Sequence, residues 1–378
     1  MIPAQRHLFD IPDGVAYLNC AYMAPLSYAV VEAARSGAER KARPWELVPD
    51  DFFSGPEAAR GLFARIIHAR ADDVALIPAA SYGLAVAARN LPVGGGQSIV
   101  VLAEQFPSNV YVWQEVAAAA GARLVTVPRP RDGGITSAVT SAIDERTAVV
   151  AVPHCHWADG ALLDLEEVTR CCRATGSSLV LDVTQSVGAL PIDVEALAPD
   201  FLVAAAYKWL LGPYSAGFMY VAPHRQAGKP IEFNWISRSD SADFRRLVDY
   251  RDGYQPGARR FDVGESANFH TIPALVAALE LVLEWGVDEI AATIAARNAE
   301  IARWANGFGL TCLDGDERAG HILGISLSDG IPADLVEYLA TANVYVSVRG
   351  QTLRISPHVY NTGADIDQLI HTLEEALG

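Results

Sequence analysis

Two charged side chains stand at the ends of apolar segments that could be strands. Open α/β sheets bind their ligands at the carboxyl ends of the strands. Asp182 ends the segment Ser-Ser-Leu-Val-Leu-Asp, and Lys208 follows Phe-Leu-Val-Ala-Ala-Ala-Tyr. A lysine beside small and aromatic residues can have its pKa lowered by desolvation, which makes it a candidate Schiff-base nucleophile. A carboxylate on a nearby strand could keep the ring nitrogen of a pyridine cofactor protonated, so that the ring accepts electrons. Either residue alone is more often a cap or a solvated loop residue, so the pair is the informative signal.

The segments that must position this pair alternate between strands and helices. Helices are predicted at 110–120 and 165–175, and each is followed by a glycine, a common helix stop. Strands are predicted at 98–102, 123–127, 148–152, 178–182, 201–206 and 218–221. This alternation predicts an α/β fold with a mostly parallel sheet between helices.

The second half of the chain has a different pattern. Residues 231–264 are polar and aromatic with little periodicity, which indicates a long ordered connection. Helices at 272–285, 288–306 and 365–377 and strands at 322–327, 344–348 and 352–355 then predict a small α+β C-terminal domain.

Composition excludes several classes of protein. The 378 residues are 51% hydrophobic and carry 29 Lys and Arg against 45 Asp and Glu, a formal charge of −16. An acidic chain of this kind is not expected to bind duplex nucleic acid or an anionic membrane surface, although a local basic pocket for a small anion remains open. We expect a cytoplasmic protein, because the N-terminus shows no signal-peptide pattern and the five cysteines are few and odd in number.

The acid and the lysine belong to a longer pattern. Asp182 begins Asp-x-x-Gln, which ends at Gln185, and Lys208 lies 26 positions after Asp182. Together with Tyr17-Leu18-Asn19 and the later Arg-x-Ser-x-x-x-Tyr-Asn-Thr, this order resembles the fold-type I, pyridoxal-phosphate-dependent enzymes of aminotransferase class V, which include cysteine desulfurases, kynureninases and isopenicillin N epimerase. The resemblance implies pyridoxal 5'-phosphate (PLP) as cofactor. It also implies that Lys208 forms the Schiff base and moves the α-proton, that Asp182 pairs with the pyridine nitrogen and that Gln185 binds the phenolic oxygen.

The same resemblance implies further cofactor contacts. Ala80, Ser81 and Tyr82 open a predicted helix, and a helix N-terminus binds phosphate well, although Ser81 is equally plausible as an ordinary N-cap. The hydroxyl of Tyr207 is expected to reach the phosphate. Phe106, in a Phe-Pro motif shared with the kynureninase and epimerase branches, is expected to stack on the cofactor ring.

The resemblance also implies three regions and a dimer. Residues 1–20 form an N-terminal segment bordering the active site, 21–264 the large PLP-binding domain and 265–378 the small domain. In the family the segment around Ser266 and Asn268 reaches across a homodimer interface to the partner's phosphate, so both are expected to bind cofactor there and the active sites to be shared.

A free amino acid is the substrate that the resemblance implies. Arg354 resembles the family's α-carboxylate clamp, since a guanidinium binds a carboxylate through two parallel hydrogen bonds. Arg349 is a weaker second contact, and Asn19 is also expected at the substrate. The family usually has asparagine at the position of Trp157, so Trp157 or Asp159 is expected to line the substrate pocket.

The reaction type is left open by these residues. Desulfurases carry a persulfide cysteine just upstream of the arginine clamp, and residues 345–353 contain none, so transamination or epimerisation is favoured. A kynureninase-like or other C–S or C–C lyase is the close alternative, supported by Phe106 and Tyr207. A non-catalytic PLP-binding module is a third hypothesis.

Other ligands are not expected. His154 and His156 invite a metal interpretation, but no spaced third and fourth ligands accompany them, so we predict no metal. The side chains of Tyr22, Trp113, Trp157, Trp209 and Tyr254 would suit an aromatic substrate, but they are equally common core or interface residues.

Overall fold

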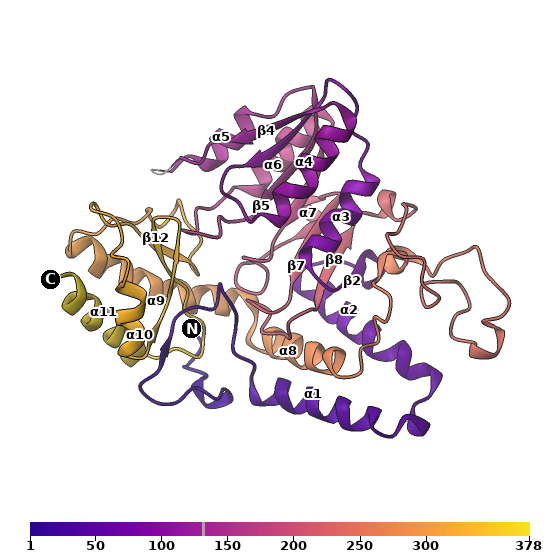
Figure 1. The fold of residues 1–378 in the computed structure, drawn as a ribbon, viewed down its shortest axis with the longest axis horizontal. Coiled ribbons are helices and arrows are strands. Elements are labelled where there is room, and N and C mark those ends of the chain that lie inside the picture. Colours follow the sequence, from indigo (N-terminus) through magenta and orange to yellow (C-terminus); the bar gives the residue numbers. More distant parts are fainter. Residues whose placement is uncertain (131–132) are drawn as a thin grey trace.

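A seven-stranded sheet forms the centre of the computed structural model, which describes residues 1–130 and 133–378. The strand order is β2-β8-β7-β6-β5-β3-β4 (Figure 1). The strands are β2 (Val74–Ile77), β3 (Ser98–Leu102), β4 (Arg123–Val127), β5 (Thr147–Pro153), β6 (Ser178–Asp182), β7 (Phe201–Ala205) and β8 (Gly217–Val221).

Helices cover both faces of this sheet because successive strand residues point to opposite sides. One face packs against α3 (Ala80–Asn90) and α4 (Ser108–Ala120). The other face packs against five helices. They are α2 (Ser54–Ile66), α5 (Ile135–Ser141), α6 (Leu165–Thr175), α7 (Val194–Leu197) and α8 (Thr271–Trp285). The strands other than the edge strand β4 are therefore almost wholly apolar and buried, as expected for a sheet covered on both faces.

The predicted fold class is confirmed, with one strand running against the others. β3, β4, β5, β6 and β7 are parallel, whereas β8 is antiparallel to both β7 and β2. β7 and β8 are joined by residues 206–216 without a crossover helix, and a short connection of this kind returns the chain antiparallel. The carboxyl ends of β2, β3, β5, β6 and β7 consequently lie at one edge of the sheet.

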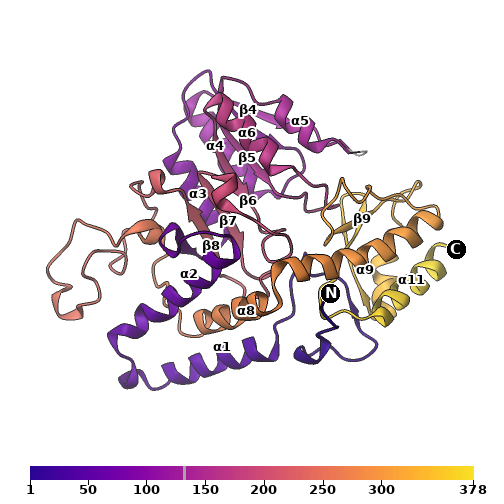
Figure 2. The same ribbon diagram turned by 180° about the vertical axis from the view of Figure 1, so that it is seen from behind.

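A separate apolar cluster holds the C-terminal part together with the N-terminal segment (Figure 2). The antiparallel strands β9 (Leu323–Ile325), β11 (Ser347–Arg349) and β12 (Thr352–Ile355) pack with α9 (Val287–Gly307), α10 (Leu335–Thr341) and α11 (Gly363–Leu377). β1 (Ala16–Tyr17) pairs in parallel with β10 (Val344–Tyr345). α8 instead packs on α2 and on α1 (Tyr28–Lys41), beside the large sheet, and the boundary at 264 and 265 stays a prediction.

A buried ion pair fixes the strand that leads into the site. The Arg60 guanidinium, 1% exposed, donates two hydrogen bonds to the Asp262 carboxylate, at 2.7 and 3.2 Å. Asp262 also accepts a bond from the backbone N–H of Leu76 in β2, at 2.8 Å. The pair thus joins α2, β2 and the end of the long connection.

Replacing Arg60 with methionine is expected to lower the free energy of unfolding by about 3–5 kcal/mol, because Asp262 would remain buried without its cation. Urea denaturation measures the change. The matched control is Arg246→Met, which breaks the exposed pair with Asp249 and should cost less than about 1 kcal/mol. A loss below about 1 kcal/mol for Arg60→Met would show that the pair does not hold β2.

Candidate active site

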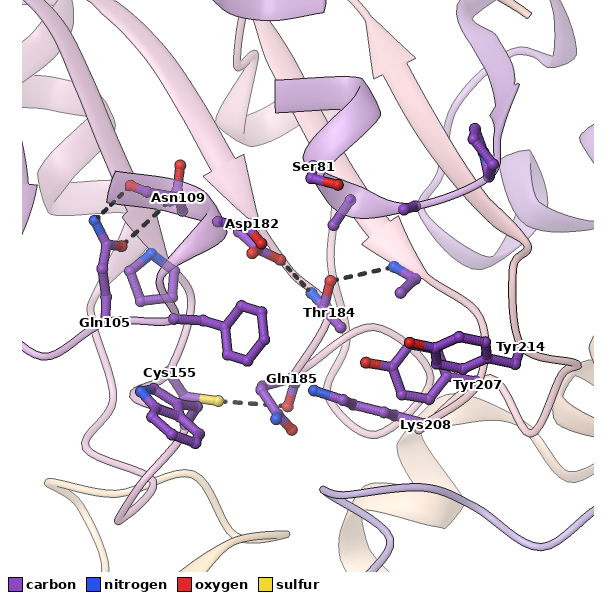
Figure 3. Close-up of a pocket in the computed structure, with 18 of the residues that line it drawn as sticks. Ser81, Gln105, Asn109, Cys155, Asp182, Thr184, Gln185, Tyr207, Lys208 and Tyr214 are labelled. Carbon is purple, nitrogen blue, oxygen red and sulfur yellow. Dashed lines mark hydrogen bonds between the residues drawn. The ribbon is translucent and has the colours of Figure 1, made fainter. Parts of the chain in front are cut away.

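A cavity of about 300 Å³ lies at the carboxyl edge of the sheet (Figure 3). It is lined by the β2–α3 turn, the β3–α4 loop and the residues that follow β5, β6 and β7. The structure brings most of the predicted cofactor residues together here. These lining residues are Ala80, Ser81, Phe106, Asp182, Gln185, Tyr207 and Lys208, together with the predicted substrate residue Trp157.

Lys208 enters the cavity from the segment after β7 (Figure 3). The residue is 6% exposed, and its Nζ lies 5.4 Å from the ring centroid of Phe106 and 5.5 Å from that of Tyr207. Burial and the nearby Arg354, opposed by Asp182, lower the pKa of Lys208 to about 8. A substantial fraction of this amine is therefore neutral, and so nucleophilic, near neutral pH.

Asp182 ends β6 and lies across the cavity from Lys208 (Figure 3). One carboxylate oxygen accepts a hydrogen bond from the backbone N–H of Thr184 at 3.0 Å. Within the described part of the chain it forms no ion pair, and burial raises its pKa. A buried carboxylate of this kind is a natural partner for a cationic N–H group of a ligand.

Two hydrogen bonds fix the side chain of Gln185. Its amide Nε2 donates to the backbone oxygen of Ala21 at 3.0 Å, and its Oε1 accepts from the indole N–H of Trp209 at 3.0 Å. An amide nitrogen carries two hydrogens, so one N–H of Gln185 is left for a ligand in the cavity.

The N-terminus of α3 forms another wall. Ala80 and Ser81 line the cavity, and the first N–H groups of a helix have no intrahelical acceptors. Tyr82, predicted beside them, does not line it: its N–H bonds to the backbone oxygen of Ala79, and burial, with the nearby Glu232, raises the pKa of its hydroxyl. Tyr207 and Tyr214 pack together next to this wall, with ring centroids 4.7 Å apart.

Phe106 and Trp157 form the aromatic side of the cavity. Their rings meet edge to face, with centroids 5.6 Å apart. The Trp157 indole N–H donates to the backbone oxygen of Glu104 at 2.7 Å, which fixes the ring against the β3–α4 loop.

Arg354 approaches Trp157 from β12. Its Nη1 donates to the Trp157 backbone oxygen at 2.8 Å, whereas Nε and Nη2 are buried without a hydrogen-bond partner in the structure. Burial, together with the neighbouring Arg349, lowers the pKa of Arg354 to about 9. A guanidinium that is 1% exposed and forms no ion pair with any described carboxylate is arranged to receive an anion.

The other predicted substrate residues lie around this arginine. Asn19 is buried and donates to the backbone oxygen of Val346 at 3.4 Å, while its Oδ1 has no partner. Arg349 is partly exposed, with its guanidinium 5.6 Å from the Trp157 ring. Asp159 does not line the cavity, because Arg129 and His156 hold its carboxylate.

Two predicted cofactor residues lie outside the cavity. Ser266 and Asn268 line a second, smaller cavity next to the β2–α3 turn. The Asn268 side chain accepts from the Thr271 N–H at 3.0 Å at the start of α8. Their predicted contact with a partner's phosphate concerns a second subunit and stays a prediction.

Several lining residues were not predicted from the sequence. They include Thr184, Gln105, Asn109, Cys155, Tyr214 and Ser215. Thr184 lies inside the Asp-x-x-Gln motif, and its hydroxyl accepts from the Ala205 N–H at 3.1 Å, which joins the ends of β6 and β7. Of the aromatic residues considered for the substrate, Trp113 and Trp209 are fully buried and Tyr254 packs on Arg238.

Comparison with known proteins agrees with this geometry. The sequence model of the family described as Aminotransferase class-V matches residues 48–369. The chain belongs to this family. The class-V chain is 30% identical to an uncharacterized aminotransferase, YcbU, of Bacillus subtilis, over 84% of this chain and 82% of that protein. It is 28% identical to a protein named as a probable cysteine desulfurase of Halalkalibacterium halodurans, over 96% and 93% of the two chains.

A solved structure supports the architecture. A C-DES mutant with glycine covalently linked to its PLP cofactor superposes with a TM-score of 0.89 over 98% of each chain, at 20% identity. The predicted family and fold type are therefore confirmed. Membership of the class-V family also supports the predicted cofactor, pyridoxal 5'-phosphate.

The cavity fits that cofactor by its donor set. It offers a buried amine with a lowered pKa, a buried carboxylate without a cation, a free amide N–H, an aromatic face and a helix N-terminus for phosphate. These are the groups that a phosphorylated pyridine aldehyde requires.

Proposed function

We propose that the chain is a PLP-dependent enzyme that acts on a free amino acid through Lys208, by transamination or epimerisation. One observation carries the proposal. The buried Lys208 amine and the Asp182 carboxylate line one cavity, and the Arg354 guanidinium, with Nε and Nη2 unpaired, donates to the backbone of Trp157 in the wall of that cavity. An amine, an acid and a carboxylate receptor are what amino-acid chemistry on PLP requires.

Each wall residue would hold one part of the cofactor. Asp182 would pair with the pyridine nitrogen and Gln185 would donate its second N–H to the phenolic oxygen. Phe106 would cover the ring, and the N–H groups of Ala80 and Ser81, with the Tyr207 hydroxyl, would bind the phosphate. When bound, PLP withdraws electrons from the bonds at the substrate's Cα.

The chain's own residues supply the proton transfer and the orientation. Lys208 Nζ accepts the α-proton and returns it, which a neutral amine with a pKa near 8 can do at physiological pH. Arg354 presents Nε and Nη2 to the α-carboxylate, which fixes the position of the Cα–H bond. The low exposure of Lys208 and Arg354 excludes water from these contacts.

The cysteines support a reaction without a thiol nucleophile. Cys155 lines the cavity and Cys20 lies beneath Lys208, but both are buried, and burial raises the pKa of each thiol. Gly350 and Gln351 close the β11–β12 hairpin, where a desulfurase would carry its cysteine. Neutral buried thiols are poor nucleophiles, so desulfuration through a cysteine persulfide is disfavoured.

A lyase that breaks a C–S or C–C bond is the second candidate. Phe106 and Tyr207 support it, and so does the probable cysteine desulfurase among the relatives. A module that binds PLP without turnover is a third candidate.

A panel of L-amino acids added to the PLP-loaded protein, with products identified by mass and chirality, tests the proposal. We expect a keto acid or the mirror-image amino acid. A side-chain fragment would establish a lyase. The absence of any product would support the non-catalytic PLP-binding module.

Capture of PLP by the cofactor-free protein is expected to depend on pH with a midpoint near 8. The free amine is the nucleophile, so the rate should rise as Lys208 loses its proton and level off above that pH. Stopped-flow absorbance between pH 6 and 10 measures the rate. A midpoint near 10.5, the ordinary value for lysine, would contradict the buried setting of this amine.

Assembly and location remain proposals. None of the described helices is long and apolar enough to cross a membrane. We propose a cytoplasmic homodimer in which Ser266 and Asn268 contact the partner's cofactor. Sedimentation of the loaded protein tests the dimer.

A further inference from the structure

Arg349 places a second guanidinium beside the proposed substrate arginine. Arg354 is paired with Ser347 across the β11–β12 hairpin, and Arg349 lies two residues after Ser347. Because strand residues alternate between faces, Arg349 and Arg354 emerge on the same face as diagonal neighbours. Both guanidiniums lie against one ring, 5.6 and 6.0 Å from the centroid of Trp157.

Arg349 lies at the outer end of this arrangement. Its guanidinium is 5.9 Å from the ring of Tyr22, an exposed residue just after the N-terminal segment. Its Nη1 donates to the backbone oxygen of Val348 at 2.8 Å. The remaining N–H groups of Arg349 form no ion pair with a carboxylate in the described part of the chain.

The charges on this side of the cavity do not balance. Lys208, Arg349 and Arg354 lie close enough that each arginine lowers the pKa of the lysine, and Arg349 lowers that of Arg354. The nearby carboxylates of Glu104 and Asp159 are both held by Arg129. Placing like charges as cross-strand neighbours costs stability, so a ligand with more than one negative charge would relieve the repulsion.

We propose that Arg349 binds a carboxylate on the substrate's side chain, so that the enzyme prefers dicarboxylic amino acids. The inference rests on the proposed function. The α-carboxylate occupies Arg354, and the side chain runs along the Trp157 ring toward Arg349. Tyr22 and Trp157 flank the outer guanidinium, which restricts its movement and directs it to the second carboxylate.

Acid and amide pairs of equal shape test this preference. The PLP-loaded protein is titrated with L-glutamate and L-glutamine, and with L-aspartate and L-asparagine, and the half-saturating concentration is read from the visible spectrum. In each pair the acid should bind about 10–100-fold more tightly than the amide, which is the gain expected for a hydrogen-bonded charge pair. Arg349→Gln should bring that ratio close to one, and Arg349→Lys should restore part of it.

The control is Arg303→Gln, on the exposed side of α9, which should keep the full ratio. Equal affinity for acid and amide in the unaltered protein, or a ratio that survives in Arg349→Gln, would overturn the inference alone. A cofactor spectrum that no amino acid changes would overturn the proposed function and this inference with it.

Discussion

Lys208→Ala is expected to abolish turnover and to remove the visible absorbance of the lysine-bound cofactor. Loss of the proton-transfer group alone should lower kcat by about 10²–10⁴-fold, and loss of the covalent attachment adds to this. Steady-state assays with the best amino acid of the panel, together with absorbance spectra, measure both effects.

The chain offers a matched control, since it holds only two other lysines, at 41 and 229. Lys229→Ala removes an exposed amine and should leave kcat and the spectrum unchanged. Circular dichroism separates loss of function from loss of fold. Turnover by Lys208→Ala within about tenfold of the unaltered enzyme would remove Lys208 from the mechanism.

Arg354→Gln is expected to raise KM for the amino acid by about 30-fold or more. The substrate's α-carboxylate would enter a buried site without its charged partner, which costs about 2–5 kcal/mol. The visible spectrum in the absence of substrate should stay as in the unaltered enzyme, because the Arg354 side chain does not line the cavity that would hold the cofactor. Initial rates over a range of amino-acid concentrations separate KM from kcat.

Arg303→Gln again serves as the control for changing an arginine. A KM within about threefold of the unaltered value in Arg354→Gln would show that the unpaired Nε and Nη2 do not receive the carboxylate. A lost cofactor spectrum would show that Arg354 supports the fold of the cavity.

The strands of the large sheet were predictable because each is a short, continuous apolar run. Strands 98–102, 123–127 and 178–182 were predicted with the bounds of β3, β4 and β6. The direction of β8 was not predictable from its residues, because it depends on the short connection from β7. The predicted strand 344–348 is two elements in the structure. It changes partner at Val346, from β1 to β12, which its local sequence does not show.

The reactive residues of the site were easier to predict from the sequence than the residues that form the walls around them. Asp182 and Lys208 stand at strand ends, and the edge where parallel strands end brings them together. Tyr214, Gln105 and Asn109, which were not predicted, reach the cavity only through tertiary packing. The unpaired atoms of Arg354 arise because a separate hairpin docks against Trp157, which no local pattern reveals.

Locating the covalently bound cofactor tests the central claim most directly. The protein is incubated with PLP, reduced with borohydride, digested and examined by mass spectrometry. The account predicts the reduced phosphopyridoxyl group on the peptide that contains Lys208, in one copy per chain and absent from Lys41 and Lys229. A group distributed among all three lysines, or found only on the two exposed ones, would contradict the assignment of this cavity as the active site.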